Sequence, residues 1–399
     1  MVSSSNRLET AFLGFPLRSP CLIGSSFLTG DIRRIKRADL HGAGGVSTKM
    51  ALLEVPFRAQ ADVIVLPNGM GIATTGDKRL PVDAACDLIR LVKQECSLMV
   101  MANVVGPDVD AEGWQLLATR LAEAGADALE LDISCPNMPP QIVEGKLTPP
   151  GACIAQFPSL SQRITRAVKD VVNIPVICKL TAVVTSIREV ALACEAGGAD
   201  AITAINGIPG VPPVDIRNGG RASFMTIREY SPGAICGPAI LPIACRAVAD
   251  IYQTVKLPII GCGGVMSWQD AVQMIMYGAS AVEMVTSIAL HGFEIVDEIN
   301  RGISAFMEEQ GYSSIEDFRG LAVRHLRRPE EMKYRDIWLT VRQDRCNRCM
   351  RCLRIGQCLA IQFRDGAIHL DNEQCIHCGT CRQVCPQQAI QYKERTALV

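Results

Sequence analysis

Eight cysteines near the end of the chain have the spacing of iron–sulfur ligands, in a sequence of 399 residues with 18 cysteines in all. The run CIHCGTCRQVCP has two, two and three intervening residues and a final Cys-Pro, which is the bacterial ferredoxin pattern. The earlier run CNRCMRCLRIGQC has two, two and five intervening residues and lacks the proline. An Ala-Ile-Gln-aromatic sequence follows each run, offset by 29 residues. The two runs are therefore predicted to be copies of one unit.

These eight cysteines are predicted to hold two [4Fe–4S] clusters. In two-cluster ferredoxins the fourth cysteine of each run binds the other cluster. One cluster is then assigned to Cys346, Cys349, Cys352 and Cys385, and the other to Cys375, Cys378, Cys381 and Cys358. Zinc is the alternative, because four thiolates suit it as well, but zinc sites usually show paired knuckles rather than three cysteines in succession.

Another cysteine, Cys135, lies in the stretch LDISCPNMPP between Ser134 and a proline. Asp132 precedes this cysteine by three positions, and Asn137 follows it by two. A thiol with a pKa of about 8.5 can give or take a proton near neutral pH once its surroundings shift that value modestly. The stretch by itself also fits a buried structural thiol, so its position in the fold has to decide.

Eight short apolar segments alternate with amphipathic segments before the cysteine-rich end. The candidate strands are residues 21–26, 45–50, 98–106, 128–135, 175–181, 201–207, 258–264 and 281–287. Such alternation predicts an α/β fold with a parallel sheet, most simply a closed (β/α)8 TIM barrel. An open doubly wound sheet is the competing architecture. That fold normally has a G-x-G-x-x-G fingerprint after its first strand, and none precedes a helix here.

In such a barrel, the carboxyl ends of the strands share one rim, and active sites lie on that rim. The residues predicted to lie there are Ser25, Lys49, Asn103, Asp132, Cys135, Asn137, Lys179, Asn206, Gly263, Gly264, Thr286 and Ser287. Two lysines, several amides and a thiol on one rim predict a site. Because two one-electron centres are attached to the barrel, a flavin is the expected connection between one-electron and two-electron chemistry.

The sequence predicts a barrel over residues 1–311, a linker over 312–343 and a small α+β ferredoxin-like domain over 344–399. The linker is rich in charge, which fits a solvated connector or a docking surface for an acidic redox partner. A net charge of −1 gives no electrostatic argument for nucleic-acid or membrane partners. The start lacks an apolar leader and no uncharged run reaches transmembrane length, so a cytoplasmic protein is expected.

From about residue 8 onward, the chain resembles the FMN-dependent dihydroorotate and dihydropyrimidine dehydrogenases. The resemblance is closest to the flavin- and ferredoxin-bearing portion of dihydropyrimidine dehydrogenase, including the bacterial subunit that carries both. The motifs that carry it are STKM, ANVVG, SCPN, CKLT, ICGPA, GCGGV, VTS and GYSSIEDFRG. The resemblance implies FMN as the barrel cofactor, and it implies that the chain forms homo- or hetero-oligomers.

The same resemblance implies roles for individual residues. The implied FMN contacts are Ser25, Lys49, Asn103, Lys179, Gly237, Gly263, Gly264, Thr286 and Ser287, the last five at the phosphate. Cys135 is the implied acid/base, which exchanges a proton with one substrate carbon while flavin N5 exchanges a hydride with its neighbour. A cation near the flavin ring also favours the reduced anionic flavin, so Lys179 is assigned a catalytic role as well.

The implied substrate contacts are Asp132, Ser134, Asn137, Asn206 and Gly207. Two of them depart from the family pattern, since Asp132 replaces an asparagine and Gly207 replaces a threonine or serine. An ionised carboxylate only accepts hydrogen bonds, whereas an amide also donates them. Altered substrate specificity is therefore expected. The segments 138–152 and 208–234, which contain Lys146 and Arg221, are expected to be long irregular loops that act as lids.

The predicted function is reversible reduction of an activated C=C bond, most simply that of uracil or thymine. Electrons would pass through the clusters to an NAD(P)H-oxidising flavoprotein subunit or a ferredoxin, because the chain has no nicotinamide fingerprint of its own. One alternative is the same chemistry on a non-pyrimidine enone or heterocycle. A second alternative is an electron-transfer subunit of a larger complex, in which the barrel is only a scaffold.

Overall fold

The computed structural model describes residues 7–55, 63–74, 78–107, 109–137, 141–143, 146–148, 151–223 and 230–394. The chain divides into two compact units, residues 1–326 and 327–399. Within the described residues, no helix is both long enough and apolar enough to cross a membrane.

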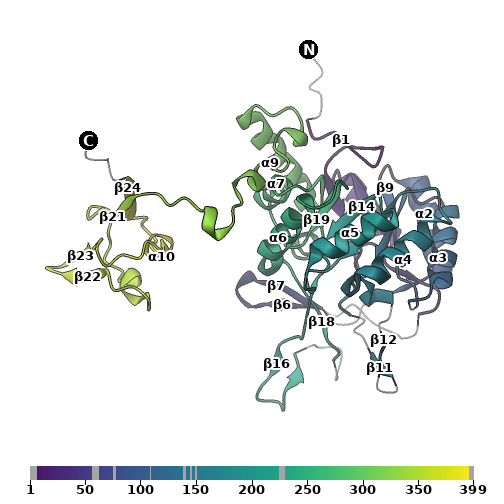
Figure 1. The fold of residues 1–399 in the computed structure, drawn as a ribbon, viewed down its shortest axis with the longest axis horizontal. Coiled ribbons are helices and arrows are strands. Elements are labelled where there is room, and N and C mark those ends of the chain that lie inside the picture. Colours follow the sequence, from purple (N-terminus) through teal and green to yellow (C-terminus); the bar gives the residue numbers. More distant parts are fainter. Residues whose placement is uncertain are drawn as a thin grey trace. The chain divides into compact units, whose positions relative to one another are not determined.

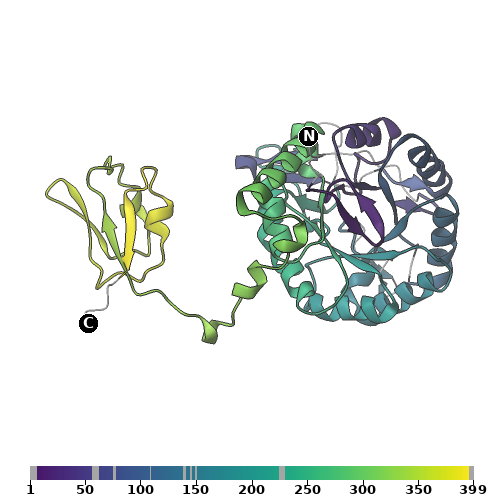
Figure 2. The ribbon, with the colours of Figure 1, turned by 90° about the horizontal axis from the view of Figure 1, so that it is seen from above.

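The first unit is a closed parallel barrel, as the sequence predicts (Figures 1 and 2). Its strands are β3 (Cys21–Ile23), β4 (Gly45–Ser47), β9 (Met99–Val104), β10 (Ala128–Asp132), β13 (Val176–Leu180), β14 (Ala201–Ala204), β19 (Ile259–Cys262) and β20 (Ala281–Met284). Neighbouring strands pair in chain order from β3 to β20, and β20 pairs with β3 to close the ring. Every residue in β9, β10, β13, β14 and β20 is buried, which explains why these strands are mostly apolar in sequence, with a few buried polar or charged residues among them.

Helices surround the strands and cover their outer faces (Figure 2). They are α1 (Ile32–Leu40), α2 (Val82–Glu95), α3 (Ala111–Glu123), α4 (Pro158–Lys169), α5 (Ile187–Gly197), α6 (Leu241–Tyr252), α7 (Trp268–Met276), α8 (Thr286–His291) and α9 (Glu294–Gln310). The apolar side chains on the inward faces of these helices pack with the strands in one large apolar cluster. Ser267 and Asp270 form a capping box at the start of α7, which fixes where this helix begins.

A hairpin closes the amino end of the barrel. Strands β1 (Thr10–Phe12) and β2 (Phe15–Leu17) pair antiparallel, and Phe12 and Leu17 are buried in a separate cluster with Leu22, Met99 and other residues at the beginnings of the barrel strands. Because this end is filled by side chains, the open end of the barrel is the one at the carboxyl ends of the strands.

A second sheet lies over that carboxyl end. Its antiparallel order is β15 (Ile208–Gly210), β18 (Gly233–Cys236), β7 (Gly71–Thr74) and β6 (Val63–Leu66). The expectation of irregular loops over residues 208–234 and 138–152 was therefore wrong in part. Residues 208–210 pair with β18, which pairs with β7, and β11 (Gln141–Val143) pairs with β12 (Lys146–Thr148). The short β16 (Val214–Asp215) and β17 (Arg221–Ala222) pair within residues 208–234. Strands β5 (Ala51–Leu52) and β8 (Leu80–Pro81) extend the barrel sheet beside β9.

The segment predicted to be a linker begins within the first unit. Ile315 and Phe318 are buried in the barrel's apolar cluster, and the Phe318 ring stacks on Tyr312 with centroids 5.4 Å apart. The division between the two units therefore falls inside residues 312–343, after this aromatic contact.

The second unit is small and built from two antiparallel pairs. Strand β21 (Ile337–Val341) pairs with β24 (Ile390–Glu394), and β22 (Ile361–Arg364) pairs with β23 (Ala367–Leu370). A short helix, α10 (Thr380–Gln383), lies within the second cysteine run. Leu339, Ile361, Ile368 and Ile390 form its apolar core together with Cys352 and Cys381.

We predict that Phe12→Ala lowers the free energy of unfolding by about 3–5 kcal/mol, because truncating a fully buried phenylalanine leaves a cavity. Urea unfolding followed by circular dichroism measures this change. The control is Leu40→Ala on α1, where the side chain is 79% exposed, and a change within about 0.5 kcal/mol is expected. Equal losses in both variants would contradict a closed amino end.

Candidate active site

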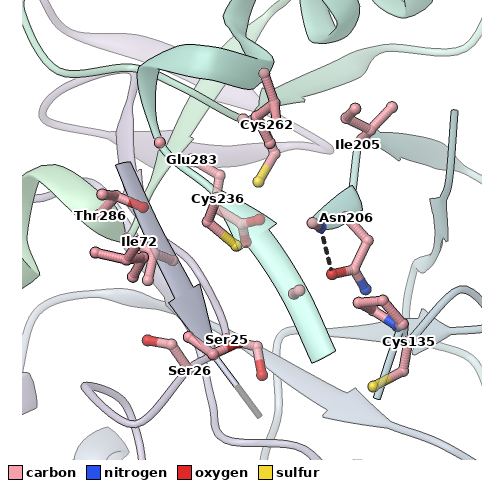
Figure 3. A pocket seen from close by; sticks show the side chains of 18 of the residues that line it. Ser25, Ser26, Ile72, Cys135, Ile205, Asn206, Cys236, Cys262, Glu283 and Thr286 are labelled. Atoms are coloured by element: carbon pink, nitrogen blue, oxygen red, sulfur yellow. Dashed lines mark hydrogen bonds between the residues drawn. The ribbon is translucent and has the colours of Figure 1, made fainter. Parts of the chain in front are cut away.

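A cavity lies at the carboxyl ends of the barrel strands, under the antiparallel sheet. It contains about 1020 Å³ of space not filled by protein atoms, part of which is open to solvent. Side chains from seven of the barrel's strand ends and from β7 and β18 line it, and Figure 3 shows ten of them with labels. A cavity of this size accommodates a cofactor and a small substrate together.

Cys135 lines this cavity directly after β10 and is 6% exposed. Burial raises the pKa of its thiol above the ordinary value. The positive charge of Arg79 opposes that increase, and Arg79 Nη2 lies 3.6 Å from Cys135 Sγ. Asp132 raises the thiol pKa further, whereas Lys49 and the backbone N–H of Asn137 lower it. Burial thus disfavours the thiolate form of Cys135, whereas the neighbouring Arg79 guanidinium favours it.

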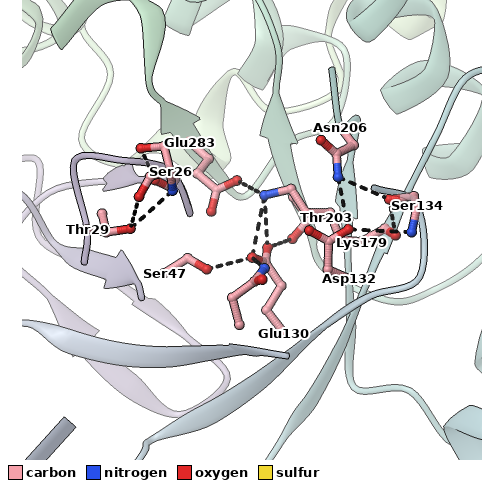
Figure 4. A network of polar contacts seen from close by, with 12 residues as sticks. Ser26, Thr29, Ser47, Glu130, Asp132, Ser134, Lys179, Thr203, Asn206 and Glu283 are labelled. Carbon is pink, nitrogen blue, oxygen red and sulfur yellow. Dashed lines mark hydrogen bonds and ion pairs between the residues drawn. The ribbon is translucent and has the colours of Figure 1, made fainter. Parts of the chain in front are cut away.

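Lys179 lies in the barrel interior between two buried glutamates (Figure 4). Its Nζ is 2.7 Å from Glu283 Oε2 and 3.4 Å from Glu130 Oε2. Burial acts to lower the pKa of Lys179, but the two carboxylates together hold it well above its ordinary value. The two carboxylates therefore hold Lys179 in its charged form.

The two glutamates differ in how well their charges are compensated. Glu130 accepts hydrogen bonds from Ser47 Oγ at 2.6 Å, Thr203 Oγ1 at 2.7 Å and Asn103 Nδ2 at 2.7 Å, in addition to the Lys179 contact. Burial would raise the Glu130 pKa, but these donors and the lysine lower it.

Glu283 has fewer donors, and its Oε1 has no hydrogen-bond partner among the described residues. Burial and repulsion from Glu130 raise the pKa of Glu283 to about 7, and Lys179 only partly compensates. Glu283 lines the cavity, so a proton on this carboxyl faces whatever the cavity binds.

Asp132 is tied to Asn206 across the rim. Asn206 Nδ2 donates to Asp132 Oδ1 at 2.9 Å, and Asn206 Oδ1 accepts from the Gly207 backbone N–H at 2.8 Å. Ser134 Oγ lies 3.4 Å from the same amide nitrogen and donates to the Lys179 carbonyl at 2.7 Å. Both the amide nitrogen and the amide oxygen of Asn206 thus already have partners within the protein, and Asp132 fixes how this amide is oriented.

Glycines let three loops come close together at the other end of the cavity. Gly237, Gly263 and Gly264 have φ angles of 100°, 117° and 85°, which favour glycine. A Cβ at Gly237 would lie 2.7 Å from the Gly71 Cα and 3.0 Å from Thr286 Cγ2. Ser287 Oγ is buried near this position and has no hydrogen-bond partner among the described residues.

Most of the residues predicted for the site line one cavity. They are Ser25, Lys49, Asp132, Cys135, Asn137, Lys179, Asn206, Gly207, Gly237, Gly263, Gly264 and Thr286. Three predicted residues do not contribute to its lining among the described residues: Asn103, Ser134 and Ser287. Asn103 lies beneath it and donates to Glu130, with its Oδ1 unpartnered in the described part of the chain.

Sequence reasoning missed several residues at this site. Glu130 and Glu283 are acidic residues inside otherwise apolar strands, a signal of paired buried charge that could have been used. Arg79 also lines the cavity and lies outside every motif. Cys236 and Cys262 line it too, and although they lie within ICGPA and GCGGV, no role in the site was predicted for them from the sequence. Arg221 is exposed on β17, and the side chain of Lys146 lies outside the described residues, as does much of 138–152.

The second unit contains two cavities, each lined by four cysteines. One is lined by Cys346, Cys349, Cys352 and Cys385, and the other by Cys358, Cys375, Cys378 and Cys381. These are the two groups into which the sequence pattern divides the cysteines. Among the described residues, no three His, Cys, Asp or Glu side chains are grouped so as to hold a single metal ion. Thiols spaced around a cavity fit a multi-iron cluster better than one zinc ion, whose ligands meet within about 2.3 Å of the metal.

Comparison with known proteins identifies relatives of both parts. The model for the family Dihydroorotate dehydrogenase matches residues 9–307, and the model for the 4Fe-4S binding domain matches residues 368–391. The chain is similar to the protein named dihydroorotate dehydrogenase B (NAD(+)), catalytic subunit, from several archaea. Identity is 34% for Pyrococcus abyssi, over 79% of this chain and 99% of the relative. It is 34% for Methanothermobacter thermautotrophicus (79% and 98%) and 40% for Methanosarcina mazei (77% and 93%).

We predict that Glu283→Gln changes how stability depends on pH. With its pKa raised to about 7, Glu283 keeps a proton in the folded state that the unfolded chain releases near pH 4.5. The folded state therefore binds more protons between these values, and stability is lost as pH rises through 7. The variant should remove this loss, at most about 3 kcal/mol, from unfolding curves at pH 5 and pH 8. Glu309→Gln, exposed on α9, is the control, and an unchanged slope in Glu283→Gln would contradict the raised pKa.

Proposed function

The chain belongs to the dihydroorotate dehydrogenase family of oxidoreductases, and on that premise we propose that it binds FMN and interconverts dihydroorotate and orotate. The observation that carries this proposal is the position of Cys135, a buried thiol on the wall of a cavity of about 1020 Å³ at the carboxyl end of the barrel. A proton donor and acceptor is needed there, and no His lines this cavity among the described residues.

The cavity fits FMN at three places. Gly237, Gly263 and Gly264 leave room for a phosphate that any Cβ would reduce, and their backbone N–H groups are the ordinary partners of such a group. Ser287 Oγ, which has no hydrogen-bond partner in the described part of the chain, lies buried beside Thr286 at the same end. Lys49 and Lys179 would hold the ring system. When bound, FMN supplies hydride transfer and connects it with one-electron carriers.

Cys135 moves the substrate proton in the proposed reaction. In the reducing direction, the S–H bond breaks and a C–H bond forms at the substrate carbon next to a carbonyl, which leaves a thiolate. In the oxidising direction, the thiolate takes that proton back. Strands β6, β7 and β18 of the antiparallel sheet contribute to the wall of the cavity, and this sheet limits the access of water to these charges.

Charge favours a carboxylated substrate. The cations that act on the Cys135 thiol are Arg79 and Lys49, and both line the cavity. Orotate carries a carboxylate that such cations attract, whereas uracil and thymine do not. The names of the relatives point to the same substrate.

Uracil or thymine reduction is the second candidate. The alignment with the Pyrococcus abyssi relative covers 99% of that protein but 79% of this chain, so about a fifth of this chain has no counterpart there. An additional electron-transfer unit in the same chain is the feature by which it resembles the dihydropyrimidine dehydrogenases. Asp132, which orients Asn206, is also a departure that allows a different ring.

For electron transfer we propose two [4Fe–4S] clusters, one in each of the two four-cysteine cavities. The match to a 4Fe-4S binding domain covers the second run, and the matching cavity of the first run supports a second cluster. Because the relatives are named NAD(+)-dependent catalytic subunits, we propose that a separate flavoprotein subunit exchanges electrons with NAD(H), with a free ferredoxin as the alternative.

We expect Cys135→Ser to retain FMN and both clusters but to slow reoxidation of the reduced flavin by about 100- to 10,000-fold, because a general acid is lost. Anaerobic stopped-flow absorbance after photoreduction measures this, with orotate, uracil and thymine mixed separately. The control is Cys96→Ser, a half-buried cysteine at the end of α2 outside the cavity. Rapid reoxidation by uracil or thymine and none by orotate would replace the first proposal with the second. A loaded flavin that none of the three reoxidises would overturn both.

We expect Cys358→Ser and Cys385→Ser each to damage the cluster held by the other run's cysteines. Cys385→Ser should alter the centre at Cys346, Cys349 and Cys352, and Cys358→Ser the centre at Cys375, Cys378 and Cys381. Low-temperature electron paramagnetic resonance of the reduced variants distinguishes the two centres, and iron analysis gives the cluster content. Loss of the centre within the same run would contradict the crossed assignment, and zinc in place of iron would contradict the clusters.

A further inference from the structure

Arg79 stands beside the proposed acid/base without belonging to any motif of the sequence. We propose that Arg79 is a positioning residue that stabilises the thiolate form of Cys135, and so sets the pH at which this thiol exchanges its proton with substrate. The proposal rests on the proposed function, because it assigns a partner to the same thiol.

The first argument is geometric. Arg79 Nη2 lies 3.6 Å from Cys135 Sγ, within hydrogen-bonding range for sulfur, and both side chains line the cavity. Arg79 is 3% exposed and Cys135 is 6% exposed, so little water screens the pair. An ion pair in such surroundings is much stronger than one on the surface.

The second argument concerns how the arginine is held. Arg79 immediately precedes β8, whose Leu80 N–H donates to the Met50 carbonyl at 3.0 Å. Strand β8 pairs with β5, and β5 pairs with β9 of the barrel. The backbone beside Arg79 is therefore fixed to the barrel wall, close to Lys49.

The third argument is the charge balance around the sulfur. The charged and titratable groups that act on Cys135 are Arg79, Asp132, Lys49 and the thiol of Cys153. Asp132 opposes a thiolate, and burial opposes it more strongly. Arg79 is the largest charge that favours it. Burial raises the pKa of Asp132, and Lys179 and Arg79 act against that increase. Without Arg79, a thiolate at Cys135 would lie next to a carboxylate in a buried site.

The consequence for the reaction follows from the proton balance. Each reduction of substrate breaks the S–H bond and leaves a negative charge on sulfur, which water must later reprotonate. The guanidinium neutralises that charge while it exists. Because Arg keeps its charge at every relevant pH, the stabilisation does not itself titrate.

Alkylation of Cys135 tests this without any turnover. Holoenzyme is treated with iodoacetamide from pH 6 to pH 11, and modification is followed by mass spectrometry of the tryptic peptide 121–146, in which Cys135 is the only cysteine. The variants are Arg79→Gln, which removes the charge, and Arg79→Lys, which retains it. Arg221→Gln removes an exposed cation from β17 and is the matched control.

We expect the thiol pKa to rise by about one to three units in Arg79→Gln, by less than one unit in Arg79→Lys, and not at all in Arg221→Gln. The pH profile of flavin reoxidation should move by the same amount. If Arg79→Gln does not fold, Arg79→Ala is used, and added guanidinium ion should restore the lower pKa.

An unchanged Cys135 pKa in a folded, FMN-loaded Arg79→Gln or Arg79→Ala protein would overturn the proposal and leave Arg79 as a structural partner of its neighbours. The outcome is separable from the function itself. A shifted pKa in a protein that none of the three substrates reoxidises would retain the role of Arg79 and reject the proposed reaction.

Discussion

The ion pair of Lys179 with Glu130 and Glu283 is the constraint on which the barrel's interior depends. One lysine and two glutamates are buried where parallel strands would otherwise present apolar side chains, and removing Lys179 would leave both carboxyl groups without their cation. Glu130 is fully satisfied by hydroxyl and amide donors from neighbouring strands, so it anchors the lysine from below. The remaining contact, to Glu283, is the less satisfied one and faces the cavity. Glu130 is thus held in its charged form, whereas Glu283 can gain or lose a proton near pH 7.

The same arrangement continues toward the substrate side of the rim. Asp132, two residues after Glu130 on β10, points to the same rim and orients the amide of Asn206. Cys135 follows three residues later, with Arg79 beside it. Both cations and carboxylates line the cavity, and the pKa values of Cys135, Asp132 and Glu283 are set by burial first and by these neighbouring charges second. Charged groups held in place in this way can stabilise the charge that develops during proton and hydride transfer in a site from which water is excluded.

The second unit has a much smaller apolar core than the barrel. Its apolar residues are few, and two of the eight cysteines, Cys352 and Cys381, are themselves part of that core. Clusters bound in the two four-cysteine cavities would add cross-links where apolar packing is thin, as small domains often require. The crossed grouping of Cys358 and Cys385 also ties the two sequence repeats into one unit.

The sequence by itself determined the barrel, its eight strands and most of the rim residues, because strand periodicity and strand-end polarity are local patterns. It also determined how the cysteines divide, since their spacing is a short-range property. Only the tertiary structure decided which charges meet. Arg79 and Cys135 are 56 residues apart, and Lys179 and Glu283 are 104 residues apart. The antiparallel sheet over the cavity joins residues 63–66 and 71–74 to residues 208–210 and 233–236 by backbone hydrogen bonds that no side-chain pattern encodes. Such contacts depend on how the barrel closes. The antiparallel sheet over the cavity, the glutamates beside Lys179 and the arginine beside Cys135 could therefore be found only in the tertiary structure.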